Sequence, residues 1–246
     1  MPVVIVALAV LIVAGGVLAA AAANPRIAVI GMAVAVAGAG FVADPLPGPT
    51  ALLAEGVGAA LAGYLGWMAL RASAPLPQDP QGPAAPAWPG AVGIAMAAFL
   101  AGWLTATAMG RALPDPSAGG PTLANVGAGL AAGSPIARAG LGAAFALIAL
   151  AIGQVLIARD VLRLGLCLML MAAATELLRA SLGAPADDTV TYAFAILYAT
   201  GGAAVAAVVA RSLDIHDDLE LRSPGPLGST EAPRMPTDAR PGSHVP

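Results

Sequence analysis

The chain has 246 residues, of which 59% are hydrophobic and only 10% are charged, and its formal net charge is −3. Because a soluble domain carries about 25% charged residues, so few charges cannot cover a water-facing surface, whereas a bilayer removes that need. The acidic balance and the lack of a basic stripe exclude a nucleic-acid partner. A single cysteine, Cys167, excludes an intrachain disulfide.

Seven apolar runs follow one another along the chain, each close to the roughly 20 residues that a helix needs to cross a membrane. The expected spans are Val3–Ala22, Ile27–Val42, Thr50–Leu70, Pro89–Met109, Ala139–Ile157, Leu162–Leu182 and Val190–Val209. The first run has no basic residue before it and is long for a signal peptide, so we expect it to be retained as a span. The predicted fold class is all-α, a polytopic bundle of about seven transmembrane helices.

Composition divides the chain into four regions. We expect an N-terminal four-helix membrane region over residues 1–110, a flexible Gly/Pro/Ser-rich loop over 111–138, a three-helix membrane region over 139–212, and a disordered acidic and proline-rich tail over 213–246.

The arginines predict an orientation. With the N-terminus outside, the inner connections hold Arg26, Arg71, Arg159 and Arg163, and the outer ones hold Arg111, Arg138 and Arg179. This excess of basic residues inside agrees with the positive-inside rule. We therefore expect a multi-pass protein of the cell (inner) membrane with a cytoplasmic C-terminus.

Two polar side chains lie within the third and fifth apolar spans. Polar groups are costly in hydrocarbon, so they mark places of function or of helix packing. Glu55 lies among closely spaced glycines, and it lines either a helix contact or a proton path. Gln154 is placed to hydrogen-bond across helices, either as a structural bridge or as part of a proton path.

The sixth span carries most of the remaining charge. Arg159, Asp160 and Arg163 bracket the short turn before it, where they either anchor the turn at the inner surface or contact a partner subunit or lipid head group. Glu176 lies about one turn from the middle of the span, and Arg179 follows on the same helix face. Glu176 is therefore either a protonatable carboxylate of a proton path or a carboxylate held by Arg179 at a helix contact.

The sequence contains no recognisable enzyme centre. It has no Gly-rich phosphate loop, no metal-spaced His/Cys set and no nucleophile elbow. Its two histidines, His216 and His244, both lie in the polar tail, which excludes an intramembrane bis-histidine haem. We expect no catalytic residue, no metal and no cofactor in this chain.

The segment at residues 152–163, IGQVLIARDVLR, joins two apolar helices through a short turn with two arginines. It resembles the K subunit of respiratory complex I, the E component of hydrogenase-4 and formate hydrogenlyase, and the C component of multi-subunit sodium/proton antiporters. The hydrogenase component is similar in length and also ends its last helix with an arginine and a Leu-Asp-[Val/Ile] segment, seen here as Arg211 and Leu213–Ile215. The resemblance is carried mainly by residues 139–215.

This resemblance implies a non-catalytic membrane subunit of a complex-I-like (NADH-quinone oxidoreductase) or membrane-bound hydrogenase-like complex that performs proton translocation. Such a subunit packs beside an antiporter-like subunit and binds no cofactor. The families place an intramembrane glutamate where this chain has Met169 or Ala172, and the acid of the next helix falls at or near Tyr198. The carboxylates of a proton path are thus lost or moved, which leaves Glu176 as the candidate for charge transfer.

Two other functions remain open at this point. One is a self-contained small transporter or channel. The other is a membrane scaffold whose tail, from Asp214 to Glu220, recruits a partner. In the first hypothesis, that of a complex, the expected partners are other membrane subunits, and in all three the chain contacts the lipid bilayer.

Overall fold

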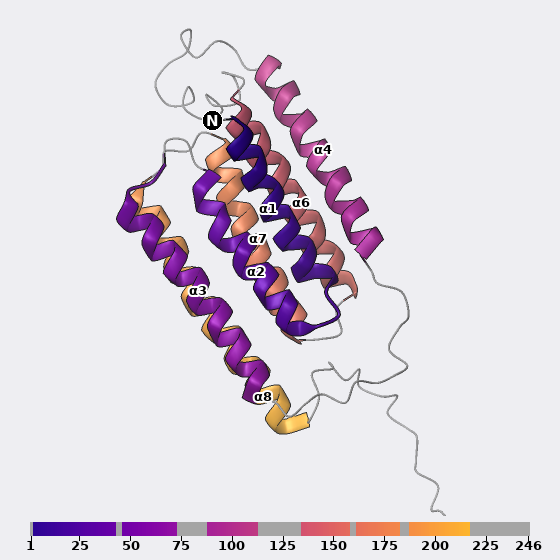
Figure 1. Ribbon diagram of the computed structural model, residues 1–246, viewed down its shortest axis with the longest axis vertical. Coiled ribbons are helices and arrows are strands. Elements are labelled where there is room, and N and C mark those ends of the chain that lie inside the picture. Colours follow the sequence, from indigo (N-terminus) through magenta and orange to yellow (C-terminus); the bar gives the residue numbers. More distant parts are fainter. Residues whose placement is uncertain are drawn as a thin grey trace, which may run out of the picture.

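A computed structural model of the chain describes residues 2–42, 46–72, 88–112, 134–157, 161–182 and 187–216. Within these ranges the chain forms seven long α-helices and one 3-10 turn, and no strand. The elements are α1 (Pro2–Ala21), α2 (Pro25–Ala39), η1 (Gly40–Val42), α3 (Pro49–Ala72), α4 (Trp88–Ala112), α6 (Pro135–Ile157), α7 (Val161–Ser181) and α8 (Asp188–His216). All seven α-helices are long and apolar enough to span a membrane, which confirms the all-α prediction and indicates a multi-pass membrane protein (Figure 1).

Helix boundaries depart from the apolar runs where capping residues set them. α6 begins at Pro135, four residues before the expected start, because Ser134 Oγ accepts the Ile136 N–H at 3.3 Å and proline suits the first helical position. At α8 a cap also sets the start, since Asp187 Oδ1 accepts the Thr189 N–H at 3.1 Å. α8 then continues to residue 216, into the predicted tail. The rest of that tail and most of the predicted 111–138 loop lie outside the described residues.

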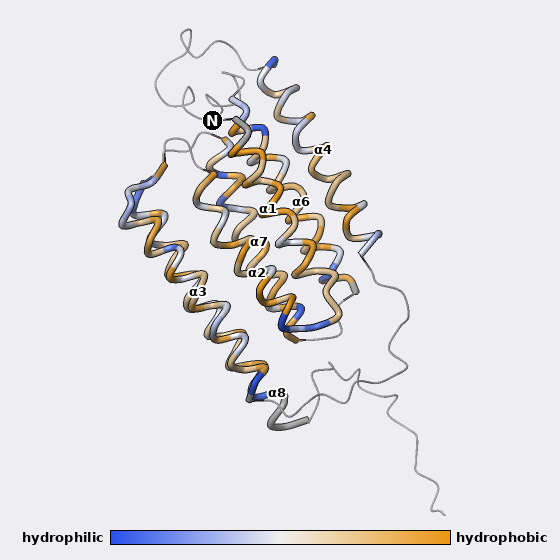
Figure 2. The backbone as a smooth tube through the Cα atoms, viewed as in Figure 1, coloured by the Kyte–Doolittle hydropathy of each residue, from blue (hydrophilic) through white to orange (hydrophobic). Residues whose placement is uncertain are grey.

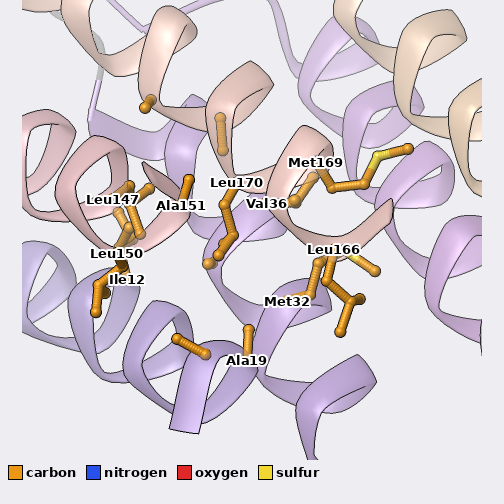
Figure 3. Close-up of a cluster of buried hydrophobic side chains, with 14 of the residues drawn as sticks. Ile12, Ala19, Met32, Val36, Leu147, Leu150, Ala151, Leu166, Met169 and Leu170 are labelled. Atoms are coloured by element: carbon orange, nitrogen blue, oxygen red, sulfur yellow. The ribbon is translucent and has the colours of Figure 1, made fainter. Parts of the chain in front are cut away.

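Four helices, α1, α2, α6 and α7, form the centre of the structure around a cluster of aliphatic side chains (Figures 1 and 3). Ile12 and Leu147 in this cluster are fully buried. α1 and α2 approach closely at glycine: a Cβ on Gly31 would lie 2.6 Å from Gly15 O. Small residues at such crossings allow tight packing between helices that are apolar on all sides.

The remaining three helices flank this centre on opposite sides (Figure 1). α4 packs against α6, while α3 and α8 pack against each other and against α2 and α7. Consecutive helices alternate in direction, so the start of α1 and the end of α8 lie at opposite ends of the molecule (Figure 1). Apolar residues dominate along the helices and hydrophilic residues gather near their ends (Figure 2), the pattern of membrane-spanning helices.

α3 and α8 run parallel, although more than a hundred residues separate them. At their N-terminal ends, the Gly48 N–H donates to Asp188 Oδ1 at 2.8 Å and the Tyr192 hydroxyl donates to Thr50 Oγ1 at 3.1 Å. Further along, Gly58 has no room for a side chain, since a Cβ there would lie 2.5 Å from the carbonyl oxygen of α8's Ala195. Two hydrogen bonds and a close backbone crossing therefore hold this pair in one register.

Candidate functional site

The carboxyl group of Glu55 is enclosed by protein. Its side chain is 2% exposed, and η1 places the Gly40 N–H so that it donates to Glu55 Oε1 at 3.0 Å. A Cβ on Gly40 would overlap the carboxyl atoms, so only glycine allows this approach. Glu55 Oε2 is also buried, and no N–H or hydroxyl group of the described residues donates to it. Glu55 is thus held on one oxygen and lacks a fixed donor on the other.

A second buried carboxyl group, that of Glu176 on α7, is bound by a tyrosine of α8. Glu176 is 6% exposed and Tyr198 is completely buried. The Tyr198 hydroxyl donates to Glu176 Oε2 at 2.6 Å, a short distance typical of a hydroxyl bound to a carboxylate. α7 and α8 are close enough for this contact because Gly165 and Gly201 meet Val205 and Met169 across the helix crossing.

These two carboxyl groups lie next to each other. They are close enough to interact electrostatically, and a proton on either one would allow a hydrogen bond between them. The carboxyl cluster comprises Glu55, Glu176, Tyr198 and the Gly40 N–H. Arg179, one turn along α7, lies near enough for its positive charge to act on Glu176.

The carboxyl cluster joins four elements, η1, α3, α7 and α8. Two carboxylate charges side by side in a low-dielectric interior repel strongly, whereas one proton between them removes half of the charge. A tyrosine hydroxyl both donates and accepts hydrogen bonds, so Tyr198 is able to follow a change of protonation on Glu176. Within the described ranges no group of three His, Cys, Asp or Glu residues is placed to hold a metal ion. The paired carboxyl groups and the adjacent hydroxyl make the arrangement suited to holding a proton.

The other predicted site residues lie apart from the carboxyl cluster. Gln154 is half-buried near the end of α6, and it lies roughly 18 Å along the helix axes from Glu176. Arg163 is half-buried on the first turn of α7, near the same end of the molecule as Gln154. Arg159 and Asp160 lie outside the described residues. The roles predicted for these four residues remain predictions.

Two members of the carboxyl cluster are not predicted from the sequence as parts of a site. Tyr198 stands out there only as the position at or near which the families that the sequence motif resembles carry an acid. A tyrosine in an apolar span carries a usable signal, however, because a buried hydroxyl needs a hydrogen-bond partner. Gly40 offers no such signal, since its function depends on the way η1 turns its N–H toward α3.

Comparison with known proteins found no match to any family model, curated protein or solved structure. The resemblance of residues 139–215 to subunits of proton-translocating complexes therefore rests on the sequence motif. The carboxyl cluster has to be interpreted from its own chemistry.

Proposed function

We propose that this protein holds a transferable proton on the Glu55–Glu176 carboxyl pair, as a non-catalytic membrane subunit of an ion-translocating complex. The observation that carries the proposal is the meeting of two buried carboxyl groups from distant parts of the chain, with a tyrosine hydroxyl and a backbone N–H as their donors. A proton shared by the pair lowers the buried charge and supplies the donor that Glu55 Oε2 lacks.

The position of the pair couples the proton to helix movement. Glu55 belongs to the α3–α8 pair and Glu176 to the central helices, so a small shift of one unit against the other lengthens the contact between the carboxyl groups. The hydrogen bonds from Gly40 to Glu55 and from Tyr198 to Glu176 cross the same interface, so the shift lengthens them as well, and the shared proton loses one of its two partners. Such an element has two states that protonation biases, which is the usual basis of a switch.

A purely structural function accounts for less of this geometry. Interhelical hydrogen bonds between neutral groups such as Ser, Thr or Asn stabilise helix contacts in membranes without burying charge. Intramembrane carboxyl groups are costly and are characteristic of ion and proton paths. Two of them in contact, rather than one opposite a neutral partner, favour the proton-holding function.

The sequence motif supports placement in a complex. Residues 139–215 resemble the K subunit of complex I, the E component of hydrogenase-4 and the C component of multi-subunit antiporters, so the partner we propose is an antiporter-like membrane protein. In this proposal, Tyr198 takes the place of the acid that those families carry on the last helix, and Glu55 supplies a carboxylate from α3. A self-contained transporter is the second candidate, and the location of the pair between two packing units favours it.

The arginines support an inner-membrane orientation with the N-terminus outside. One end of the helices holds Arg26, Arg71, Arg163 and Arg211, and the other holds Arg111, Arg138 and Arg179. The first end is the cytoplasmic one under the positive-inside rule.

The proton-holding function is tested by infrared difference spectroscopy on the full chain reconstituted in liposomes at neutral pH. We expect a C=O stretching band of a protonated carboxyl group, and we expect both Glu55→Gln and Glu176→Gln to abolish it, because the two groups share one proton. Glu231→Gln, the same chemical change in the tail, is the matched control and leaves the band in place. Absence of the band from the unmodified protein, or its survival in both variants, would overturn the proposal.

Membership of a complex is tested separately by gentle-detergent purification of the tagged protein from its native membrane, followed by mass spectrometry. Recovery with antiporter-like, quinone-reactive or hydrogenase-type subunits supports a function within a complex. Recovery alone as a monodisperse monomer or dimer contradicts it and favours the self-contained transporter.

A further inference from the structure

A long apolar groove lies between α2 and α3, separate from the carboxyl cluster. Its volume is about 600 Å³, and it is lined by α2 from Val29 to Ala37 and by α3 from Gly56 to Trp67. Ile30 and Tyr64 line it and are both more than half exposed, so the groove opens outward from the helices. It exists because α3 presents small residues here, and a Cβ on Gly56 would meet nothing within 4 Å.

Two arginines mark one end of this groove. α2 and α3 are antiparallel neighbours, and a Cβ on Gly66 would lie 3.4 Å from a methyl group of Val29, so the start of α2 lies beside the end of α3. Arg26 precedes Val29 by about one turn and is exposed. The Arg71 guanidinium carbon lies 4.0 Å from the centre of the Trp67 ring. A guanidinium stacked in this way keeps its edge N–H groups available for an anion.

The groove has the length of one membrane leaflet. From Val29 to Ala37 the helix rises about 12 Å, and from Gly56 to Trp67 about 16 Å. The hydrocarbon core of a bilayer is about 30 Å thick, so the groove extends from the arginines to about the middle of the core. A partner helix would make contact across the full thickness, whereas one acyl chain occupies one leaflet.

We propose that this groove binds one anionic phospholipid, with an acyl chain lying along it and the phosphate bound by Arg26 and Arg71. Guanidinium groups bind phosphate oxygens with paired, charge-assisted hydrogen bonds, and basic pockets at helix ends bind anionic head groups. Trp67 lies at the level where aromatic side chains favour the membrane interface. The far end of the acyl chain lies next to the α3 turn that carries Glu55, so the bound lipid covers the membrane side of that helix.

The test is native mass spectrometry of the full chain, released from nanodiscs made of phosphatidylglycerol and phosphatidylcholine in equal amounts. We expect one phosphatidylglycerol to be retained preferentially, and Arg71→Gln or Arg26→Gln to lower that retention about tenfold, the effect of losing one charge-assisted contact. Arg111→Gln, the same change at the opposite end of the molecule on α4, is the matched control and leaves retention unchanged.

Variants that fill the groove provide a second, independent test of lipid binding. Gly56→Leu places a side chain in open space and is expected to abolish retention, with Ala60→Leu as a second variant on the same wall. Gly93→Leu on α4, where a Cβ also meets nothing within 4 Å, is the control. Equal retention of both lipids, or retention unaffected by the two filling variants, overturns the proposal. The proposal is also overturned if the unmodified protein is a dimer and Gly56→Leu makes it monomeric. That result would assign the groove to a second copy of the chain.

Discussion

Replacement of Gly40 by alanine tests the geometry of the carboxyl cluster most directly. The added methyl group would occupy the space of the Glu55 carboxyl group, so that group must move away and lose the 3.0 Å hydrogen bond from the residue 40 N–H. Loss of a hydrogen bond to a charged group costs about 1.5–3 kcal/mol, and forcing a methyl group into a packed interior costs about 1–3 kcal/mol. Gly40→Ala should therefore lower the free energy of unfolding by about 4 kcal/mol.

The assay is thermal unfolding of the purified protein in detergent, followed by near-UV circular dichroism. For a protein of this size each kcal/mol moves the midpoint by about 2–4 °C, so the expected decrease is on the order of 10 °C. Gly93→Ala on α4 is the control, because a Cβ there meets nothing within 4 Å and the change should stay within about 0.5 kcal/mol.

The double variant Gly40→Ala/Glu55→Ala shows whether the loss of stability comes from the contact between residue 40 and the Glu55 carboxyl group. Once Glu55→Ala has removed the carboxyl group, the added methyl group at Gly40 has space, so the double variant should be more stable than the sum of the single effects by about 1–3 kcal/mol. Strict additivity would mean that Gly40 and Glu55 are not in contact, and it would refute the arrangement described above.

Two further predictions concern the helix contacts around the cluster. Tyr198→Phe removes the hydroxyl bound to Glu176 Oε2 and leaves a buried carboxyl oxygen without this donor, so the unfolding free energy should fall by about 1–3 kcal/mol, whereas Tyr64→Phe at an exposed position should change it little. An equal response of both variants in thermal unfolding would contradict the hydrogen bond. Gly58→Leu forces α3 away from α8 and should greatly reduce disulfide cross-linking between cysteines introduced at positions 48 and 188, where a Cβ on residue 48 would lie 3.3 Å from Asp188 Cγ, while Gly56→Leu should not. Unchanged cross-linking in Gly58→Leu would show that the close backbone crossing is absent.

The number and order of the helices could be predicted from the sequence because hydropathy alone marks a membrane span. The starts of the helices were less predictable where polar caps decide them. Ser134 and Pro135 extend α6 beyond its apolar run, and this signal was present in the sequence but was obscured by the polar character of Arg138. Hydropathy identifies the segments that are apolar enough to span a bilayer, whereas hydrogen bonding of the first N–H groups sets the residue at which a helix begins.

The carboxyl cluster could be predicted only in part. Glu55 and Glu176 could both be recognised, because an acidic residue in an apolar span is costly wherever it lies. Their meeting was not predictable, since it depends on which helices become neighbours, and glycine and alanine are spread over every span of this chain. Tyr198 lies beside Glu176 for the same reason: the α7–α8 crossing, set by glycines such as Gly165, determines which side chains face each other.

The parallel pairing of α3 with α8 has a consequence for biogenesis. During synthesis the third helix is complete more than a hundred residues before the last one begins, so its glycine-lined surface and Glu55 lack the neighbours that later enclose them. A carboxyl group in that position is costly until α7 and α8 have followed. Completion of the chain therefore closes the site, and we expect a chain that stops before α8 to leave this surface exposed and prone to aggregation.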